Sequence, residues 1–140
     1  MILAGKPLIP LVKLMDDNRE RLIVILAGYS KNMDDFLLTN PGLKSRFPNI
    51  IEFADYSPDE LMLIADNQYS SKGYVLDDGA RDKLRTIFEK VLHEKAFGNG
   101  RYVRNVFERS VNKQALRLST DPDLTREELV TIEADDIEEV

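Results

Sequence analysis

Arginines at two places in the chain have the types and positions best suited to chemistry. Arg46 lies in the segment Ser45-Arg46-Phe47, while Arg101 opens a helix after Gly98-Asn99-Gly100, with Arg104 one turn further on. A guanidinium is permanently charged and forks onto two oxygens of a phosphate. The first turn of a helix adds free N–H groups and the positive end of the helix dipole. Each arginine is therefore a candidate for binding phosphate, and an ordinary solvent-exposed arginine is the alternative.

Other kinds of site find little support in the residue counts. The chain has no cysteine and one histidine, His93, so a disulfide framework, a thiolate nucleophile and a histidine cluster for zinc are excluded. His93 falls near the end of an expected helix, where a cation is mildly favoured, and needs no further role. The adjacent acids at 34–35 and 77–78 are better explained by helix capping and solvation than by acid–base catalysis.

Charge is unevenly distributed over the 140 residues. The formal net charge is -6, yet the segment 119–140 holds nine acidic residues and one basic residue, so the rest is almost neutral. This tail is expected to be a solvated end or a contact with a neighbouring subunit. The longest apolar run, Leu22 to Ala27, is far shorter than the roughly 20 residues that span a bilayer. These features predict a soluble, cytoplasmic protein with no membrane contact.

The first third of the chain must position Arg46. A helix ending near Asn18 is followed by the apolar, β-branched run 22–27, which predicts a buried parallel strand. Tyr29 follows that strand. A short helix near Met33 is then broken by Asn40-Pro41-Gly42, which leads into a loop through residues 45–48 and an edge strand over 49–53.

In the rest of the chain, apolar residues recur at the spacing of α-helices. Ser57, Pro58 and Glu60 form a strong start signal for a helix that runs to about Ser71. A second helix begins at Asp77 or Asp78 and carries the apolar stripe Leu84, Ile87, Phe88, Val91 and Leu92. A third runs from about Arg101 to Leu118, with one apolar and one basic face. The apolar positions 124, 129, 132 and 137 suggest a short C-terminal segment that folds back against these helices.

The predicted fold class is an α/β fragment followed by an all-α helical bundle. The two domains are expected at residues 1–53 and 54–140. One buried strand with a helix cannot cover both of its own faces, so partner strands are missing from these residues. We therefore expect a fragment truncated at its N-terminus.

Several motifs, in order, resemble the AAA+ ATPases of the CbbX and stage V sporulation protein K group. They are the runs 14–19 (LMDDNR), 24–29 (VILAGY), 40–47 (NPGLKSRF), 52–57 (EFADYS) and 97–105 (FGNGRYVRN). The match is good over residues 11–118. The resemblance implies the C-terminal end of the AAA+ large domain plus the helical lid domain.

The resemblance also implies roles for individual residues. Arg46 matches the family's arginine finger, which reaches the γ-phosphate in a neighbouring subunit. Arg101 matches the second sensor arginine, which contacts nucleotide in its own subunit, and Arg104 is a weaker candidate beside it. Tyr29 stands where many AAA+ proteins place a polar first sensor, usually Asn, so either a water-positioning role or simple packing remains open for it.

The implied protein is an ATP-driven remodelling machine, normally a homo-hexameric ring that uses ATP and Mg²⁺. A phosphate-binding loop with its Lys and Ser or Thr, and an apolar strand ending in Asp-Glu, are not found in the sequence. These 140 residues are therefore expected to be inactive alone and to hold no nucleotide tightly. The client protein is not identifiable from the sequence.

A second reading comes from a different functional class. The chain would be a stand-alone helical adaptor or a nucleic-acid-binding module that uses the basic face from Arg101 to Arg117. Few aromatic residues interleave with these charges, and the body is nearly neutral. Nucleic acid is therefore the less favoured partner.

Overall fold

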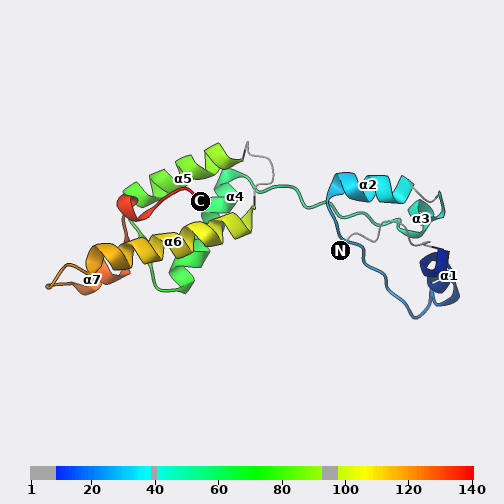
Figure 1. Ribbon diagram of the computed structural model, residues 1–140, viewed down its shortest axis with the longest axis horizontal. Coiled ribbons are helices and arrows are strands. Elements are labelled where there is room, and N and C mark those ends of the chain that lie inside the picture. Colours follow the sequence, from blue (N-terminus) through cyan, green and yellow to red (C-terminus); the bar gives the residue numbers. More distant parts are fainter. Residues whose placement is uncertain (1–8, 39–40, 93–97) are drawn as a thin grey trace. The chain divides into compact units, whose positions relative to one another are not determined.

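The computed structural model describes residues 9–38, 41–92 and 98–140 (Figure 1). The chain divides into two units, residues 1–53 and residues 54–140. Asn40 and the segment 93–97, which includes His93, lie outside the described residues.

The first unit contains three short helices. They are α1 (Ile9–Asp17), α2 (Ser30–Leu38) and α3 (Pro41–Arg46). The first two agree with the apolar spacing of the sequence. The third was expected to be a loop, but Pro41 at its first position has a backbone angle already suited to a helix, so the helix runs to Arg46 itself.

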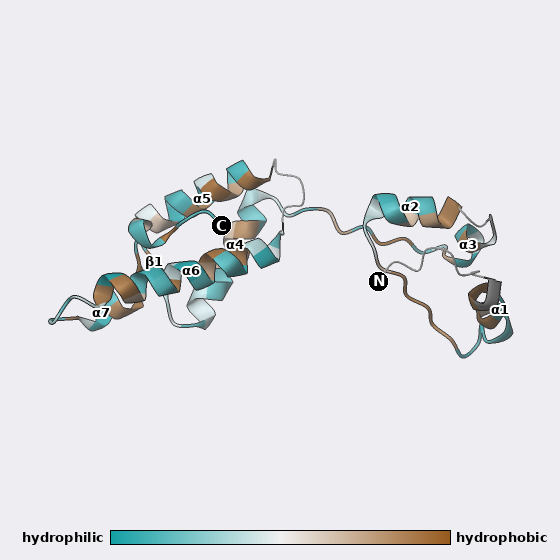
Figure 2. Cartoon of the chain, viewed as in Figure 1, coloured by the Kyte–Doolittle hydropathy of each residue, from teal (hydrophilic) through white to brown (hydrophobic). Residues whose placement is uncertain are grey.

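Neither of the strands expected in the first unit is formed. Residues 22–29 and 47–57 have no regular secondary structure, although Figure 2 shows much of the first segment as hydrophobic. Ile23 and Phe53 are 89% and 91% exposed. A strand exists only when a neighbour accepts its N–H groups and donates to its carbonyls, and the described part of this unit has no such neighbour.

The second unit is built on three long helices. They are α4 (Pro58–Ser71), α5 (Asp78–Val91) and α6 (Gly100–Leu118), so all three predictions are confirmed to within a few residues. The expected capping box is present on α4, where Ser57 and Glu60 exchange hydrogen bonds. Asp77 caps α5 by accepting a bond from the backbone N–H of Ala80.

A short C-terminal segment closes the second unit. It comprises α7 (Arg126–Val130), β2 (Thr131–Ile132) and a 3-10 turn, η1 (Ala134–Asp136). The strand β2 pairs in parallel with β1 (Val75–Leu76), placing Val75 opposite Thr131 and Leu76 opposite Ile132. This two-stranded sheet was not predicted. In Figure 1 the red C-terminal chain lies beside α5, in agreement with the contacts of η1 with α5 and α6.

The hydrophobic core of the second unit joins all of these elements. Its buried members include Leu61, Tyr69, Leu84, Phe88, Val103, Val106, Ile132 and Ile137. Tyr69 packs edge-on against Phe107, with ring centroids 4.9 Å apart, and its hydroxyl is 2.7 Å from the Ser110 hydroxyl. Burial raises the pKa of Tyr69 to about 12. The helix α6, which carries Arg101 and Arg104, is thus held on a well-packed support.

Candidate functional site

Arg46 ends α3 and is held by two hydrogen bonds to Asp16. Its Nε donates to Asp16 Oδ1 over 2.9 Å, and its Nη2 donates to Asp16 Oδ2 over 2.6 Å. A third bond runs from Nη1 to the carbonyl oxygen of Gly42, one turn earlier in the helix, over 2.8 Å. The hydrogen bond to the carboxylate raises the pKa of Arg46 and lowers that of Asp16. Both groups are therefore charged at neutral pH.

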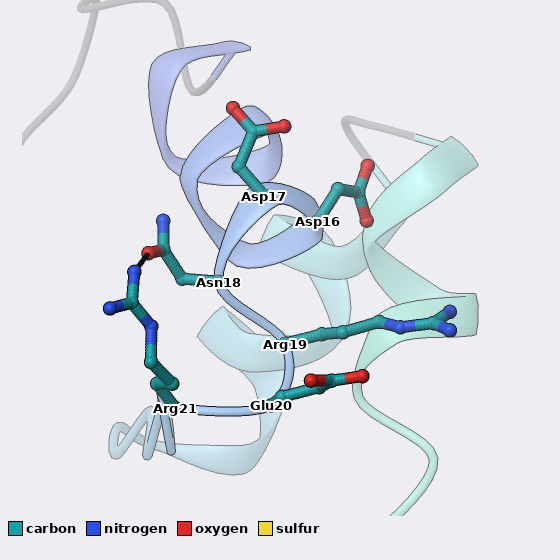
Figure 3. Close-up of a pocket in the computed structure, with 6 residues that line it drawn as sticks. All are labelled: Asp16, Asp17, Asn18, Arg19, Glu20 and Arg21. Carbon is teal, nitrogen blue, oxygen red and sulfur yellow. Dashed lines mark hydrogen bonds between the residues drawn. The ribbon is translucent and has the colours of Figure 1, made fainter.

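Asp16 was not singled out as a partner by the sequence. It lies 30 residues before Arg46, on the last turn of α1, and only the fold brings the two together. Residues 16–21 line a shallow hollow, and Figure 3 shows the side chains of Asp16 and Arg19 pointing to the same side of it. The positive charge of Arg19 also lowers the pKa of Asp16.

Tyr29 lies just before α2, and its carbonyl oxygen accepts the backbone N–H of Met33. Its side chain is 84% exposed, so the packing role considered for it has no support among the described residues. Arg46 belongs to the same unit, but in the described chain no hydrogen bond joins the two residues. The first-sensor role remains a prediction.

Arg101 and Arg104 are both exposed on α6, three positions apart and therefore on one face of the helix. Within the described residues neither forms an ion pair, although α6 carries three other basic side chains that do. Arg109 and Lys113 pair with Glu138, at 3.8 Å and 2.9 Å. Arg117 pairs with Glu133 and Asp136.

Part of the acidic tail is thus built into the second unit's own structure and is not simply a solvated end, while a contact with a neighbouring subunit stays a prediction. Asp136 is 1% exposed and accepts bonds from Arg117 Nε and Nη2, at 3.0 Å and 2.8 Å. Gln114 donates to the carbonyl oxygens of Glu128, Leu129 and Thr131. The sequence showed the charges of both segments but not that one segment folds back onto the other.

This pairing removes most of the basic face on which the nucleic-acid reading depends. Of the five basic residues from Arg101 to Arg117, the last three are neutralised by carboxylates of residues 133–138. A surface that binds a nucleic-acid backbone needs several unpaired cations along one face. Among the basic residues of α6, only Arg101 and Arg104, at its N-terminal end, form no ion pair within the described residues.

The start of α6 is held by Asn99, whose role the sequence did not reveal. Its side-chain Nδ2 donates to Asp55 Oδ1 over 2.6 Å, and its Oδ1 accepts the backbone N–H of Tyr56 over 2.9 Å. Its φ of 48° is the one positive value for a residue other than glycine in the described chain. A positive φ is uncommon for residues other than glycine, and the glycines on either side of Asn99 were the sequence signal of a sharp turn. Asn99 thereby ties α6 to the segment preceding α4.

Metal binding and membrane insertion receive no support from the described residues. They contain no group of three or more His, Asp or Glu side chains placed to hold a metal ion. None of the helices in the described ranges is long and apolar enough to cross a bilayer. The residues that fit a nucleotide are the arginines, which suit phosphate oxygens, and a set of Mg²⁺ ligands is not among them.

Comparison with known proteins identifies the second unit. A family model described as "AAA lid domain" matches residues 57–140. Stage V sporulation protein K of Bacillus subtilis (strain 168) is 44% identical over 130 residues, which cover 91% of this chain and 40% of the relative. The chloroplastic ribulose bisphosphate carboxylase/oxygenase activase of Cyanidioschyzon merolae is 36% identical over 129 residues, covering 91% of this chain and 44% of the relative.

A third relative is longer. The ESX-3 secretion system protein EccA3 of Mycobacterium tuberculosis (strain ATCC 25618 / H37Rv) is 37% identical over 141 residues, which cover 88% of this chain and 22% of that protein. The chain spans about two fifths of the length of the first two relatives. These matches confirm the resemblance drawn from the sequence motifs.

Proposed function

Because the chain belongs to the AAA lid domain family, we propose that it forms the C-terminal portion of an AAA+ ATPase that couples ATP binding and hydrolysis to protein remodelling. The family match over residues 57–140 is the observation that carries this proposal. In it, residues 1–53 are the end of the nucleotide-binding domain and residues 54–140 are the lid. The phosphate-binding loop and the Mg²⁺ ligands lie outside these 140 residues.

Arg46 is proposed as the arginine finger. A guanidinium that meets the γ-phosphate across a subunit boundary stabilises the charge of the transition state for phosphoryl transfer. The position of Arg46 at the end of α3, partly exposed and charged, is compatible with this role. Tyr29, exposed before α2, is proposed to position the attacking water.

Arg101 is proposed as the second sensor, with Arg104 assisting. Both keep an unpaired charge at the start of α6 in the described chain. The hydrogen bonds of Asn99 to Asp55 and Tyr56 fix where that start lies. The working assembly is a homo-hexameric ring in the cytoplasm, acting on a protein client, with ATP and Mg²⁺ as its cofactors.

The test is an ATPase assay of the full-length protein with Arg46→Ala. Hydrolysis is expected to fall by about a thousandfold, the usual contribution of an arginine finger, while nucleotide binding is retained. Lys44→Ala is the matched control, because Lys44 lies on the same helix and is exposed. Unchanged hydrolysis, or loss of nucleotide binding itself, contradicts the finger role.

Two further measurements test the assembly and the isolated chain. In mixed rings of Arg46→Ala subunits and phosphate-loop mutants, activity is expected to return only where an intact finger faces an intact phosphate loop. Recovery in no mixture contradicts action between subunits. The 140-residue chain alone is expected to hydrolyse no ATP. ATP turnover by the purified chain would contradict the proposal that the phosphate-binding loop and the Mg²⁺ ligands lie outside these residues.

A further inference from the structure

The way in which Arg46 is held points to a second residue of the same site. A guanidinium has five N–H donors in a plane: one on Nε and two on each terminal nitrogen. Asp16 takes the donor on Nε and one on Nη2, and the carbonyl of Gly42 takes one on Nη1. One N–H on each terminal nitrogen is left without a partner among the described residues.

The two remaining N–H donors of Arg46, one on Nη1 and one on Nη2, are available to bind a ligand. A donor on each terminal nitrogen is what a guanidinium uses to grip two oxygens of a phosphate. Asp16 occupies the adjacent side edge, formed by Nε and Nη2, with both of its carboxylate oxygens, and the Gly42 carbonyl uses one of the two donors on Nη1. Asp16 therefore holds the arginine without blocking its terminal edge.

Holding an arginine in this way has a physical benefit. A free arginine side chain loses rotamer entropy when it is fixed. Three bonds from two different elements, Asp16 at the end of α1 and Gly42 in α3, already fix this one. A preorganised donor does not have to be ordered again during the reaction.

We propose that Asp16 is a positioning residue for Arg46, which holds the guanidinium so that its terminal edge is presented to a phosphate group of nucleotide in a neighbouring subunit. The proposal deepens the proposed function, because it requires Arg46 to be the finger. Asp16 acts through Arg46 and does not itself touch nucleotide. Figure 3 shows the side chains of Arg19 and Glu20 on the same side as Asp16, and the positive charge of Arg19 helps to keep the Asp16 carboxylate charged by lowering its pKa.

The experiment uses the full-length ATPase with Asp16→Asn and Asp16→Ala. Asparagine offers one acceptor oxygen in place of two, so kcat is expected to fall by about tenfold with KM nearly unchanged, as is usual when a supporting residue is removed, and to fall further for alanine. Asp17→Asn is the matched control, because Asp17 is adjacent, exposed and points elsewhere in Figure 3. An unchanged or raised kcat for both Asp16 variants overturns the proposal.

The double variant separates positioning from a structural role. In an Arg46→Ala background, Asp16→Asn is expected to cause no additional loss, because the residue through which it acts is gone. An additional loss of the same size overturns the proposal. If Arg46→Ala itself leaves hydrolysis unchanged, the proposed finger role fails, and that outcome is distinct from a failure of Asp16 alone.

A measurement on the full-length protein does not depend on activity. The Nε–H proton of Arg46, bonded to Asp16 over 2.9 Å, is expected to give a slowly exchanging NMR signal that shifts in Asp16→Asn and not in Asp17→Asn. An identical signal in all three proteins overturns the positioning role.

Discussion

At the scale of single residues, the arginines differ chiefly in whether a carboxylate neutralises them. Arg117 is neutralised by Asp136 and serves the structure of the second unit. Arg101 remains unpaired within the described chain, and Arg46 is paired along one edge only. The difference between a structural and a chemically available arginine is thus decided by neighbours and not by residue type.

The first residue-scale prediction concerns Arg101. In the full-length protein, Arg101→Ala is expected to weaken nucleotide binding by about tenfold or more, because a hydrogen bond to a charged group contributes about 1.5–3 kcal/mol. The affinity is measured with a fluorescent nucleotide.

The matched control for Arg101 is Arg109→Ala on the same helix, where the side chain already pairs with Glu138. Nucleotide affinity is expected to stay unchanged there. Equal weakening by the two substitutions would mean that only general positive charge matters.

At the scale of elements, two helices of the second unit begin with reciprocal caps. On α4 the backbone N–H and hydroxyl of Ser57 donate to Glu60, and on α7 the hydroxyl and backbone N–H of Thr125 donate to Glu128. These bonds lower the pKa of both glutamates below the ordinary value of 4.5. The caps fix where each helix starts, and therefore where α4 leaves the preceding segment.

The caps make the stability of the second unit depend on pH. Since the pKa of each glutamate is lower in the folded state, both contribute stability above pH 4.5, and it is lost as the pH falls through the folded pKa. Glu60→Gln is expected to lower the free energy of unfolding at pH 7 and to make it less dependent on pH in the acid range. Urea unfolding at pH 7 and pH 3 measures both effects.

The control for the cap is Glu108→Gln, an exposed glutamate within α6. It is expected to leave both the stability and its pH dependence unchanged. If Glu60→Gln and Glu108→Gln give the same pH profiles, the capping box does not contribute to acid sensitivity.

At the scale of the whole molecule, the two units differ in how they bury apolar surface. All members of the hydrophobic core lie between residues 61 and 137. In the described part of residues 1–53, Leu43 is the one fully buried apolar side chain, while Ile23, Ile25 and Phe53 are 85–91% exposed. The second unit therefore has its own core, and the first does not.

The whole-molecule prediction is that residues 54–140 fold alone. Their core, caps and C-terminal ion pairs are internal, so removing residues 1–53 is expected to leave a helical circular dichroism spectrum and one cooperative unfolding transition. The transition temperature is compared with that of the 140-residue chain. A spectrum of an unfolded chain would show that the second unit depends on the first.

The sequence alone determined most of the second unit, because its signals are local. The Ser57 to Glu60 box, the glycine break before Arg101 and the apolar stripe of α5 each act within a few residues, and all three appear in the structure. The motifs also identified the family, and they nominated Arg46 and Arg101. What these residues do not form is non-local: a strand needs a partner, the partner strands were expected to be missing, and the runs 22–27 and 49–53 have none in the described chain.

Only the tertiary structure decided which charges are paired. Asp16 and Arg46 are 30 residues apart, and Arg117 is 19 residues from Asp136, so neither contact follows from spacing along a helix or strand. A sequence shows which charged residues could form ion pairs. An ion pair forms only where the packing of helices brings two such groups within about 4 Å of each other. The fold therefore paired three cations of the basic helix face with carboxylates of the acidic tail, and left the arginines at the start of α6 open.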